Sequence, residues 1–193
     1  INKYTLGAII KNHGGIPIFH ATVLDTWEDL NAAVDSNLDE DMIVFSGGSS
    51  VGEHDLILDI IKNRGKVLFH GVAVKPGKPT VFGKINAKPT LGMPGYPTSC
   101  LSNGYMLLVP IIRRLARLPI YKPVTISLPL AKRVISTTGR HQFYTVRIEK
   151  DFAMPVFKAS GDITSMSSAD GYFEIPAQTD IVEKGEIVEV KLF

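Results

Sequence analysis

Apolar positions in the first two thirds of the chain recur at helical and strand spacings in turn. Leu6, Ile9 and Ile10 share one helical face, and a glycine pair follows where that helix should end. The pattern predicts helices at 3–12, after Asp25 and Thr26, from 56 to near 65 and at 98–118. It predicts strands at 16–24, 42–45, 66–74, 80–85 and 88–92, the last two joined as a hairpin around Asn86 and Ala87. Pro110 should kink or break the last helix. Strands alternating with helices predict a three-layer α/β domain with a mainly parallel sheet.

The pattern changes after two prolines, Pro119 and Pro123, which bracket a predicted linker. Short strands are predicted at 124–128, 142–149 and 187–192, with no helix between them. The residues alone indicate a small β domain, either a barrel or a sandwich. The predicted domains are therefore 1–119 and 122–193.

Composition limits the partners that the chain is expected to have. A formal charge of +2 is too small to make a nucleic acid or an anionic membrane the expected main partner. One cysteine excludes an internal disulfide framework, and no stretch resembles a secretory signal or a membrane span. A cytoplasmic protein is expected.

The loop that follows the strand at 42–45 is rich in glycine and serine. Its backbone N–H groups could approach an anion closely at the start of the next helix. It lacks the lysine of a P-loop and the spacing of the dinucleotide fingerprint. A tight turn with capping hydroxyls explains the loop about equally well. The residues concerned are Ser46, Gly47, Gly48, Ser49, Ser50 and Gly52.

Two acids, Glu53 and Asp55, stand at the start of the helix after this loop. Carboxylates in this position either cap the helix, which is the commoner use, or hold a divalent metal beside a phosphate. Asp25 follows a neighbouring predicted strand and could join them, although a simple cap explains it locally. The functional interpretation is an Mg²⁺ site that neutralises a diphosphate.

Two further loops carry groups suited to oxyanions. In the loop Lys75–Pro79, two prolines and a glycine stiffen a turn that presents Lys75 and Lys78. Another loop includes Pro94 and Gly95 and opens a helix for which Thr98 or Ser99 is the expected cap. Cys100 is expected to be a buried small residue. The histidines show no zinc-ligand spacing, and only His54 lies within a candidate site.

Three ordered motifs give the chain a family resemblance: Ser-Gly-Gly-Ser-Ser-Val-Gly-Glu-His-Asp55, Val-Ala-Val-Lys-Pro-Gly-Lys-Pro79 and Gly-Met-Pro-Gly-Tyr-Pro-Thr-Ser99. With Gly139-Arg140 and Ser165-Met-Ser-Ser-Ala-Asp-Gly171, the chain resembles the molybdopterin molybdenumtransferases, the family that includes the catalytic domain of gephyrin. The resemblance implies a molybdopterin-binding domain followed by a C-terminal β-barrel. It also implies a reaction in which adenylylated molybdopterin and molybdate yield molybdenum cofactor and AMP, assisted by Mg²⁺.

The resemblance also assigns roles to particular positions. It implies that Asp55 is the leading catalytic and metal-binding acid, with Glu53 and Asp25 as further metal ligands. It makes Lys75 and Lys78 catalytic cations. The residues implied to hold the pterin, molybdate and phosphate are Ser46, Gly47, Gly48, Ser49, Ser50, Gly52, Pro94, Gly95, Ser99, Arg140 and Ser168.

The chain departs from the family pattern in three ways. Full-length relatives have two further N-terminal domains, used in forming a homodimer and in completing the site across it, and an upstream strand that opens the α/β domain. Tyr96 stands where the family has asparagine, and so does Asp170. The chain is therefore expected to be the C-terminal portion of a longer protein.

Two alternatives remain beside the transferase. The small molybdopterin adenylyltransferases share a Gly-Gly loop and an acid but end without a C-terminal barrel, so the tail through Phe193 favours the transferase. The second alternative is a non-catalytic scaffold that binds a partner protein, as gephyrin also does. These residues do not reveal a groove for such a partner.

Overall fold

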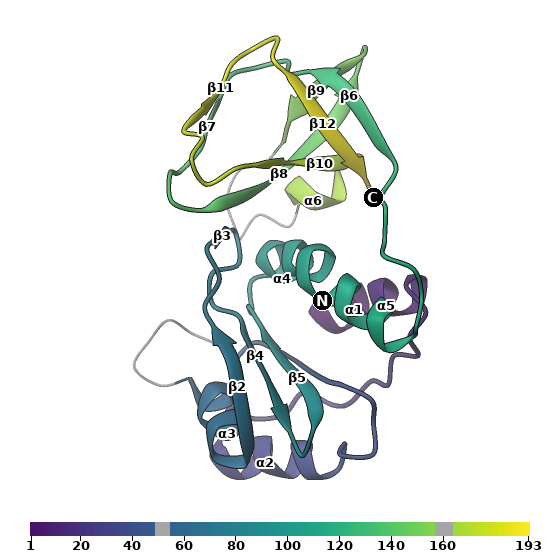
Figure 1. Cartoon of the computed structure of the whole chain (residues 1–193), viewed down its shortest axis with the longest axis vertical. Helices are drawn as coiled ribbons and strands as arrows, with labels where there is room; N and C mark the ends of the chain where they lie inside the picture. Colours follow the sequence, from purple (N-terminus) through teal and green to yellow (C-terminus); the bar gives the residue numbers. More distant parts are fainter. Residues whose placement is uncertain (49–54, 157–163) are drawn as a thin grey trace. The chain divides into compact units, whose positions relative to one another are not determined.

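The computed structural model describes residues 1–48, 55–156 and 164–193. The chain divides into two compact units, one made of residues 1–72 and 77–120 and the other of residues 73–76 and 121–193 (Figure 1). The short segment 73–76 thus belongs to the second unit although both of its neighbours in sequence belong to the first. Each unit has its own hydrophobic core.

The first unit is built on a four-stranded sheet in the order β1 (Ile43–Ser46), β5 (Lys88–Met93), β4 (Val81–Ile85) and β2 (Gly65–His70). Among the described strands of this sheet, β1 and β5 form the one parallel pair, so the prediction of a mainly parallel sheet was wrong. The reason is local. Asn86 and Ala87 both adopt positive φ, 47° and 67°, and form the tight turn that makes β4 and β5 antiparallel.

Helices cover both faces of this sheet. On one face, α2 (Trp27–Asp35) and α3 (Leu56–Arg64) pack on alternate side chains of β1 and β4. On the other face lie α1 (Asn2–Asn12), α4 (Pro97–Asn103), a π-helical turn η1 (Gly104–Leu108) and α5 (Val109–Leu115). The unit therefore has the helix–sheet–helix layers that the sequence predicts.

The strand predicted at 16–24 is not formed. This segment follows α1 in an irregular conformation, with Ile16 90% and Leu24 68% exposed, while Val23 packs against the core of the α2–α3 face. A strand requires a neighbouring ladder to satisfy its backbone, and none of the described strands pairs with this segment. The apolar pattern of this segment suits a strand, but the pattern does not show whether a neighbouring strand is present to pair with it.

The helix predicted at 98–118 is interrupted where proline requires it. Pro110 lies in the first turn of α5, directly after η1. Because proline has no N–H and its ring clashes with the preceding turn, the helix widens into a π turn before it. The predicted break at Pro110 is confirmed.

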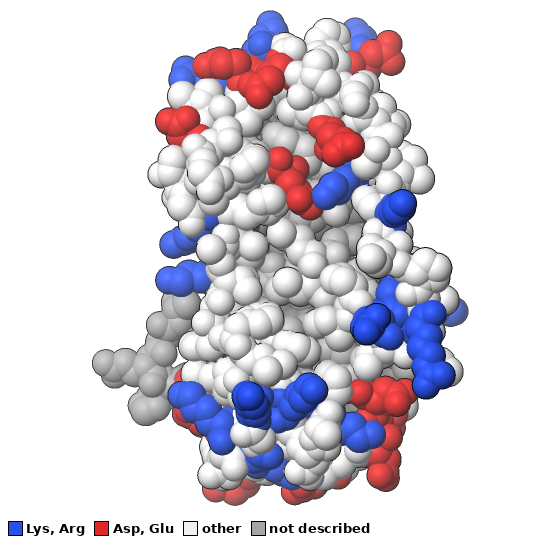
Figure 2. All heavy atoms as spheres, viewed as in Figure 1, with Lys and Arg blue, Asp and Glu red and all other residues white. Residues whose placement is uncertain are grey.

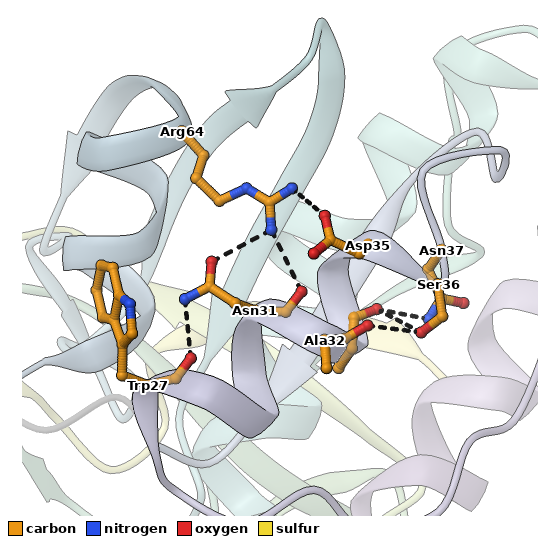
Figure 3. A network of polar contacts seen from close by, with 8 residues as sticks. Trp27, Asn31, Ala32, Asp35, Ser36, Asn37 and Arg64 are labelled. Atoms are coloured by element: carbon orange, nitrogen blue, oxygen red, sulfur yellow. Dashed lines mark hydrogen bonds and ion pairs between the residues drawn. The ribbon is translucent and has the colours of Figure 1, made fainter.

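A polar network joins the two helices of the α2–α3 face (Figure 3). Arg64, the last residue of α3, donates to the backbone and side-chain oxygens of Asn31, both at 3.2 Å, and pairs with Asp35. Asn31 in turn donates to the carbonyl of Trp27 at 2.8 Å. The network fixes α2 to the end of α3, and it thereby supports the helix whose other end carries Asp55.

The second unit is a β structure with two sheets around one core. Its larger sheet has the order β3 (Val74–Lys75), β8 (His141–Glu149), β10 (Gly171–Ile175), β12 (Ile187–Leu192) and β6 (Thr125–Pro129), with β9 (Phe152–Pro155) also on β8. Strands β7 (Val134–Ile135) and β11 (Ile181–Val182) form a separate pair. Across the described strands the larger sheet ends at β3 and β6, and β7 and β11 pair with each other instead of joining it, so the predicted β-barrel is not confirmed. A one-turn helix, α6 (Thr164–Ser167), also appears where the sequence predicted none.

The charges on the surface are mixed in sign. Figure 2 shows Lys and Arg beside Asp and Glu on the face in view, so the small net charge results from balance between many charged groups. In the part of the chain that the structure describes, none of the helices is long and apolar enough to span a bilayer.

Candidate functional site

Asp55 occupies the start of α3, where it combines two roles. Its Oδ1 caps the helix by accepting a hydrogen bond of 3.0 Å from the backbone N–H of Leu58. The residue is only 5% exposed, and its Oδ2 is buried without a hydrogen-bond partner among the described atoms. The Nε2 atom of His70 lies 3.5 Å from this oxygen. A buried carboxylate oxygen in this state is expected to have a cation or donor as its functional partner.

Asp25 lies beside Gly48, in the loop after β1, and beside the first turn of α3. A Cβ built on Gly48 would be 3.1 Å from Asp25 Oδ1 and 3.3 Å from Ile57 Cδ1, so these three residues meet. The simple-cap interpretation of Asp25 was wrong. Thr26 caps α2 instead, accepting from the backbone N–H of Asp29 at 3.2 Å. The Asp25 carboxylate therefore faces the glycine loop without capping α2.

The other predicted metal ligand, Glu53, lies outside the described residues, as do Ser49, Ser50, Gly52 and His54. Among the residues that are described, no group of three or more His, Cys, Asp or Glu side chains is arranged to hold a metal. The metal set of Asp55, Glu53 and Asp25 therefore stays a prediction.

The loops that follow the parallel strands β1 and β5 approach each other at Gly47 and Gly95. The side-chain amide of Asn2 donates to Ser46 Oγ at 2.6 Å and to the carbonyl of Gly95 at 2.9 Å. A Cβ on Gly95 would lie 3.4 Å from the Cα of Gly47, whose N–H donates to the Met93 carbonyl at 3.1 Å. Asn2 has no predicted role, because its contact with Gly95 joins residues 93 positions apart in the sequence.

The helix after the loop that follows β5 begins differently from the prediction. Tyr96 is the N-cap of α4 and makes no side-chain cap bond, and Pro97 follows it in the first turn, so a Thr98 or Ser99 cap was wrong. Pro94 and Ser99 are buried, whereas Gly95 and Tyr96 are exposed. The exposed backbone of Gly95 is thus better placed than the Ser99 side chain to meet a ligand from solvent.

Cys100 is fully buried beside Ser46, with its Sγ 3.5 Å from Ser46 Oγ. Burial raises the pKa of its thiol to about 11, which keeps it protonated near neutral pH. The predicted role as a buried small residue is confirmed.

The stiff Lys75–Pro79 loop spans the boundary between the two units. Lys75 belongs to β3, which pairs in parallel with β8, and its Nζ donates to Thr137 Oγ1 at 2.6 Å within the second unit. Lys78 belongs to the first unit and is exposed. The two predicted catalytic cations are therefore held by different units.

Asn103 of α4 fixes the first-unit part of this loop. Its Nδ2 donates to the Gly77 carbonyl at 2.8 Å and to Thr80 Oγ1 at 2.7 Å, and the side chain is fully buried. Gly77 has a φ of +121°, and a Cβ there would lie 2.4 Å from Asn103 Oδ1. Glycine is required by both the conformation and the contact, so the backbone that presents Lys78 has little freedom.

Arg140 and Ser168 both lie in the second unit. Arg140 is half-buried and precedes β8, while the Ser168 carbonyl accepts from Arg147 Nε at 3.0 Å. Asp170, which replaces the family's asparagine, accepts a hydrogen bond of 2.7 Å from the Ile148 N–H through its Oδ2. The substitution therefore keeps a structural acceptor.

Comparisons with known proteins identify the family of each unit. Residues 1–114 match the family model described as "Probable molybdopterin binding domain". The chain belongs to this molybdopterin-binding family. Residues 127–193 match the model described as "MoeA C-terminal region (domain IV)", so the second unit also has a named counterpart.

Relatives of the molybdopterin-binding family resemble the chain over most of its length. A molybdopterin biosynthesis protein of Methanocaldococcus jannaschii is 35% identical over 193 residues, covering 99% of this chain and 46% of that protein. The molybdopterin molybdenumtransferase of Nostoc is 32% identical over 122 residues, covering 61% of this chain and 28% of that enzyme. A crystal structure of the MoeA protein of Pyrococcus horikoshii superposes with a TM-score of 0.86 at 40% identity, over 100% of this chain and 47% of that one. The chain thus spans less than half the length of each of these proteins.

Proposed function

We propose that this chain is the portion of a molybdopterin molybdenumtransferase that binds adenylylated molybdopterin and molybdate, inserting molybdenum into the pterin dithiolene with release of AMP. The observation that carries the proposal is the state of Asp55. One carboxylate oxygen caps α3, and the other is buried without a hydrogen bond beside a glycine loop. Such an oxygen is suited to a divalent cation, the partner that cleavage of a diphosphate needs.

The carboxylates of Asp55 and Asp25 fit an Mg²⁺ ion that binds together with the substrate. Asp55 Oδ2 is the buried oxygen without a hydrogen bond, and Asp25 supplies a second carboxylate, which is exposed, next to Gly48. When bound, Mg²⁺ would neutralise the diphosphate and polarise it for cleavage. Asp55 would hold its anionic oxygen in place without reorganisation, since its other oxygen is already fixed by the helix.

The loops of the first unit would hold the anionic parts of the substrate. The clamp from Asn2 keeps Ser46 and Gly95 at adjacent strand ends, where exposed backbone can approach a ligand. Asn103 stiffens the backbone that presents Lys78, which reduces the ordering cost of binding a phosphate or molybdate oxyanion. For Lys75, Arg140 and Ser168 of the second unit, a role in substrate binding stays a prediction from the family resemblance.

Lys78→Ala is expected to weaken binding of adenylylated molybdopterin by about tenfold or more, because one charge-assisted contact to an oxyanion contributes about 1.5–3 kcal/mol. The change removes a cation from a backbone that Asn103 holds, so the loop should keep its conformation. Pterin fluorescence titration measures the dissociation constant, and the defect should shrink as salt is raised.

Lys84→Ala is the matched control, since Lys84 is also exposed but lies within β4. Its dissociation constant should match that of the wild type. Equal weakening by both substitutions would show that only the overall charge matters and would count against a site at this loop.

The two alternatives make different demands on the molecule. A molybdopterin adenylyltransferase would not need the C-terminal unit, whose match to the MoeA C-terminal region favours the transferase. A non-catalytic scaffold would not need a buried orphan carboxylate, so loss of Asp55 function should leave scaffold binding intact.

A further inference from the structure

We propose that His70 is a second protein ligand, together with Asp55, of the divalent cation. The site would then prefer an ion that accepts imidazole, such as Mn²⁺ or Co²⁺, over Mg²⁺. This inference rests on the proposed function only in taking Asp55 as a cation ligand.

The separation of the two side chains suits a bridging cation better than a direct hydrogen bond. His70 Nε2 lies 3.5 Å from Asp55 Oδ2, and that oxygen has no hydrogen-bond partner among the described atoms. An N–H···O hydrogen bond would bring the two atoms to about 2.7–3.2 Å. Two ligands at about 2.0–2.2 Å from one ion stand about 3.4 Å apart in tetrahedral geometry and about 2.8–3.1 Å apart in octahedral geometry. The observed separation suits a tetrahedral ion directly, and a movement of the partly exposed His70 side chain by about 0.5 Å would suit an octahedral one.

Asp55 is already oriented as a ligand should be. Metal-binding carboxylates commonly have their other oxygen engaged in a hydrogen bond that fixes their direction. Asp55 Oδ1 is engaged in this way by the N–H of Leu58, which leaves Oδ2 directed to His70. The cap on α3 therefore acts as the supporting contact of a metal site.

His70 is held by the sheet on the other side of the pair. It is the last residue of β2 and pairs with Val81 of β4, and the next residue, Gly71, donates to the Thr80 carbonyl at 2.8 Å. The side chain is 40% exposed, in contrast to 4% for that of Asp55. An ion between them would thus have one ligand on a buried helix cap and one at an accessible strand end, where water or substrate oxygens could complete its coordination.

The combination of ligands predicts the class of ion. Mg²⁺ favours oxygen ligands and gains little from imidazole, whereas Mn²⁺, Co²⁺ and Zn²⁺ accept imidazole and carboxylate together. A preference for transition ions alone would not identify the site, because most mixed sites bind them more tightly than Mg²⁺. The decisive quantity is how much of that preference depends on His70.

The test is Mn²⁺ binding to the chain, followed by electron paramagnetic resonance, with pulsed detection of nitrogen coupled to the bound ion. Wild type should bind Mn²⁺ with a nitrogen coupling. His70→Gln should remove the coupling and raise the Mn²⁺ dissociation constant by at least about tenfold, while the Mg²⁺ constant changes by less than about threefold. His70→Asp should restore Mn²⁺ binding without the coupling, because it supplies an oxygen ligand.

A histidine control separates His70 from other sources of nitrogen. His20 is exposed and belongs to the irregular segment after α1. His20→Gln should retain the nitrogen coupling.

The proposal is overturned if wild type binds Mn²⁺ without nitrogen coupling, or if the coupling survives in His70→Gln. Either result would show that His70 and Asp55 are only an ion pair and do not share a cation. A cation could still bind Asp55, so the proposed function would not be contradicted. Conversely, a His70-dependent coupling in a protein that releases no AMP would support this inference and count against the proposed function alone.

Discussion

Asp55→Asn is expected to slow molybdate-dependent AMP release by at least about 100-fold, the usual loss when a central electrostatic group of an active site is removed. The substitution is nearly isosteric, and its amide oxygen can still accept the hydrogen bond from the Leu58 N–H. Because asparagine is as good an N-cap as aspartate, α3 should keep its stability. The slower AMP release would therefore result from removal of the negative charge on the buried Asp55 Oδ2.

The control for this substitution is Asp59→Asn on the same helix. The Asp59 side chain is 46% exposed and pairs with Lys62 at 3.7 Å, so its carboxylate is neither buried nor the cap of α3. The rate of AMP release by Asp59→Asn should equal that of the wild type. Equal rates in Asp55→Asn and wild type would remove Asp55 from the chemistry.

Phe143→Ala is expected to lower the free energy of unfolding of the second unit by about 3–5 kcal/mol, as for other large buried aromatic residues. Phe143 is 1% exposed, and its ring stacks on that of Tyr172 with centroids 3.9 Å apart. Removing it would lose buried area and leave a cavity beside Tyr172, on the face of the sheet that the two rings share. Hydrogen exchange of the amides in these strands measures the effect for this unit separately.

The matched control is Phe152→Ala, since Phe152 lies on β9 of the same unit but is 42% exposed. It should cost less than about 1 kcal/mol. A similar loss of protection in both variants would contradict the assignment of Phe143 to the core. If Phe143→Ala left exchange unchanged, the stacked pair would not be a support of this unit.

Local signals in the sequence predicted the elements that depend on local physics. The apolar faces of α1 and α3 gave nearly their observed bounds, and the turn at Asn86 and Ala87 gave the hairpin. The break at Pro110 followed from the missing N–H of proline. Each of these features is determined within a few residues of where it occurs.

Features that depend on distant partners were predicted less well. The apolar segment 16–24 looked like a strand, but a strand also requires a neighbour that no pattern within the segment can supply. The strand predicted at 66–74 ends at His70, because Gly71 adopts a φ of +81° and the next strand, β3, joins the second unit. Likewise, short strands predicted the β character of the second unit but not how its two sheets divide.

In the candidate site, too, local features were predicted and contacts between distant residues were not. Motifs placed Asp55 and the three loops at helix starts and strand ends, where backbone and charge can meet an anion. The contacts that organise the loops come from Asn2 and Asn103, and the contact to Asp55 comes from His70; these three residues stand in none of the motifs. Their partners are distant in sequence, so only the folded chain reveals them.

The most direct test of the proposed function is AMP release from adenylylated molybdopterin, measured with and without molybdate. The chain is assayed alone and after extension by the upstream half of the Methanocaldococcus jannaschii relative, of which this chain covers 46%. We predict that the extended protein releases one AMP per substrate molecule and does so only when molybdate is present. Binding of the substrate with no AMP release, or release at the same rate without molybdate, would contradict the account.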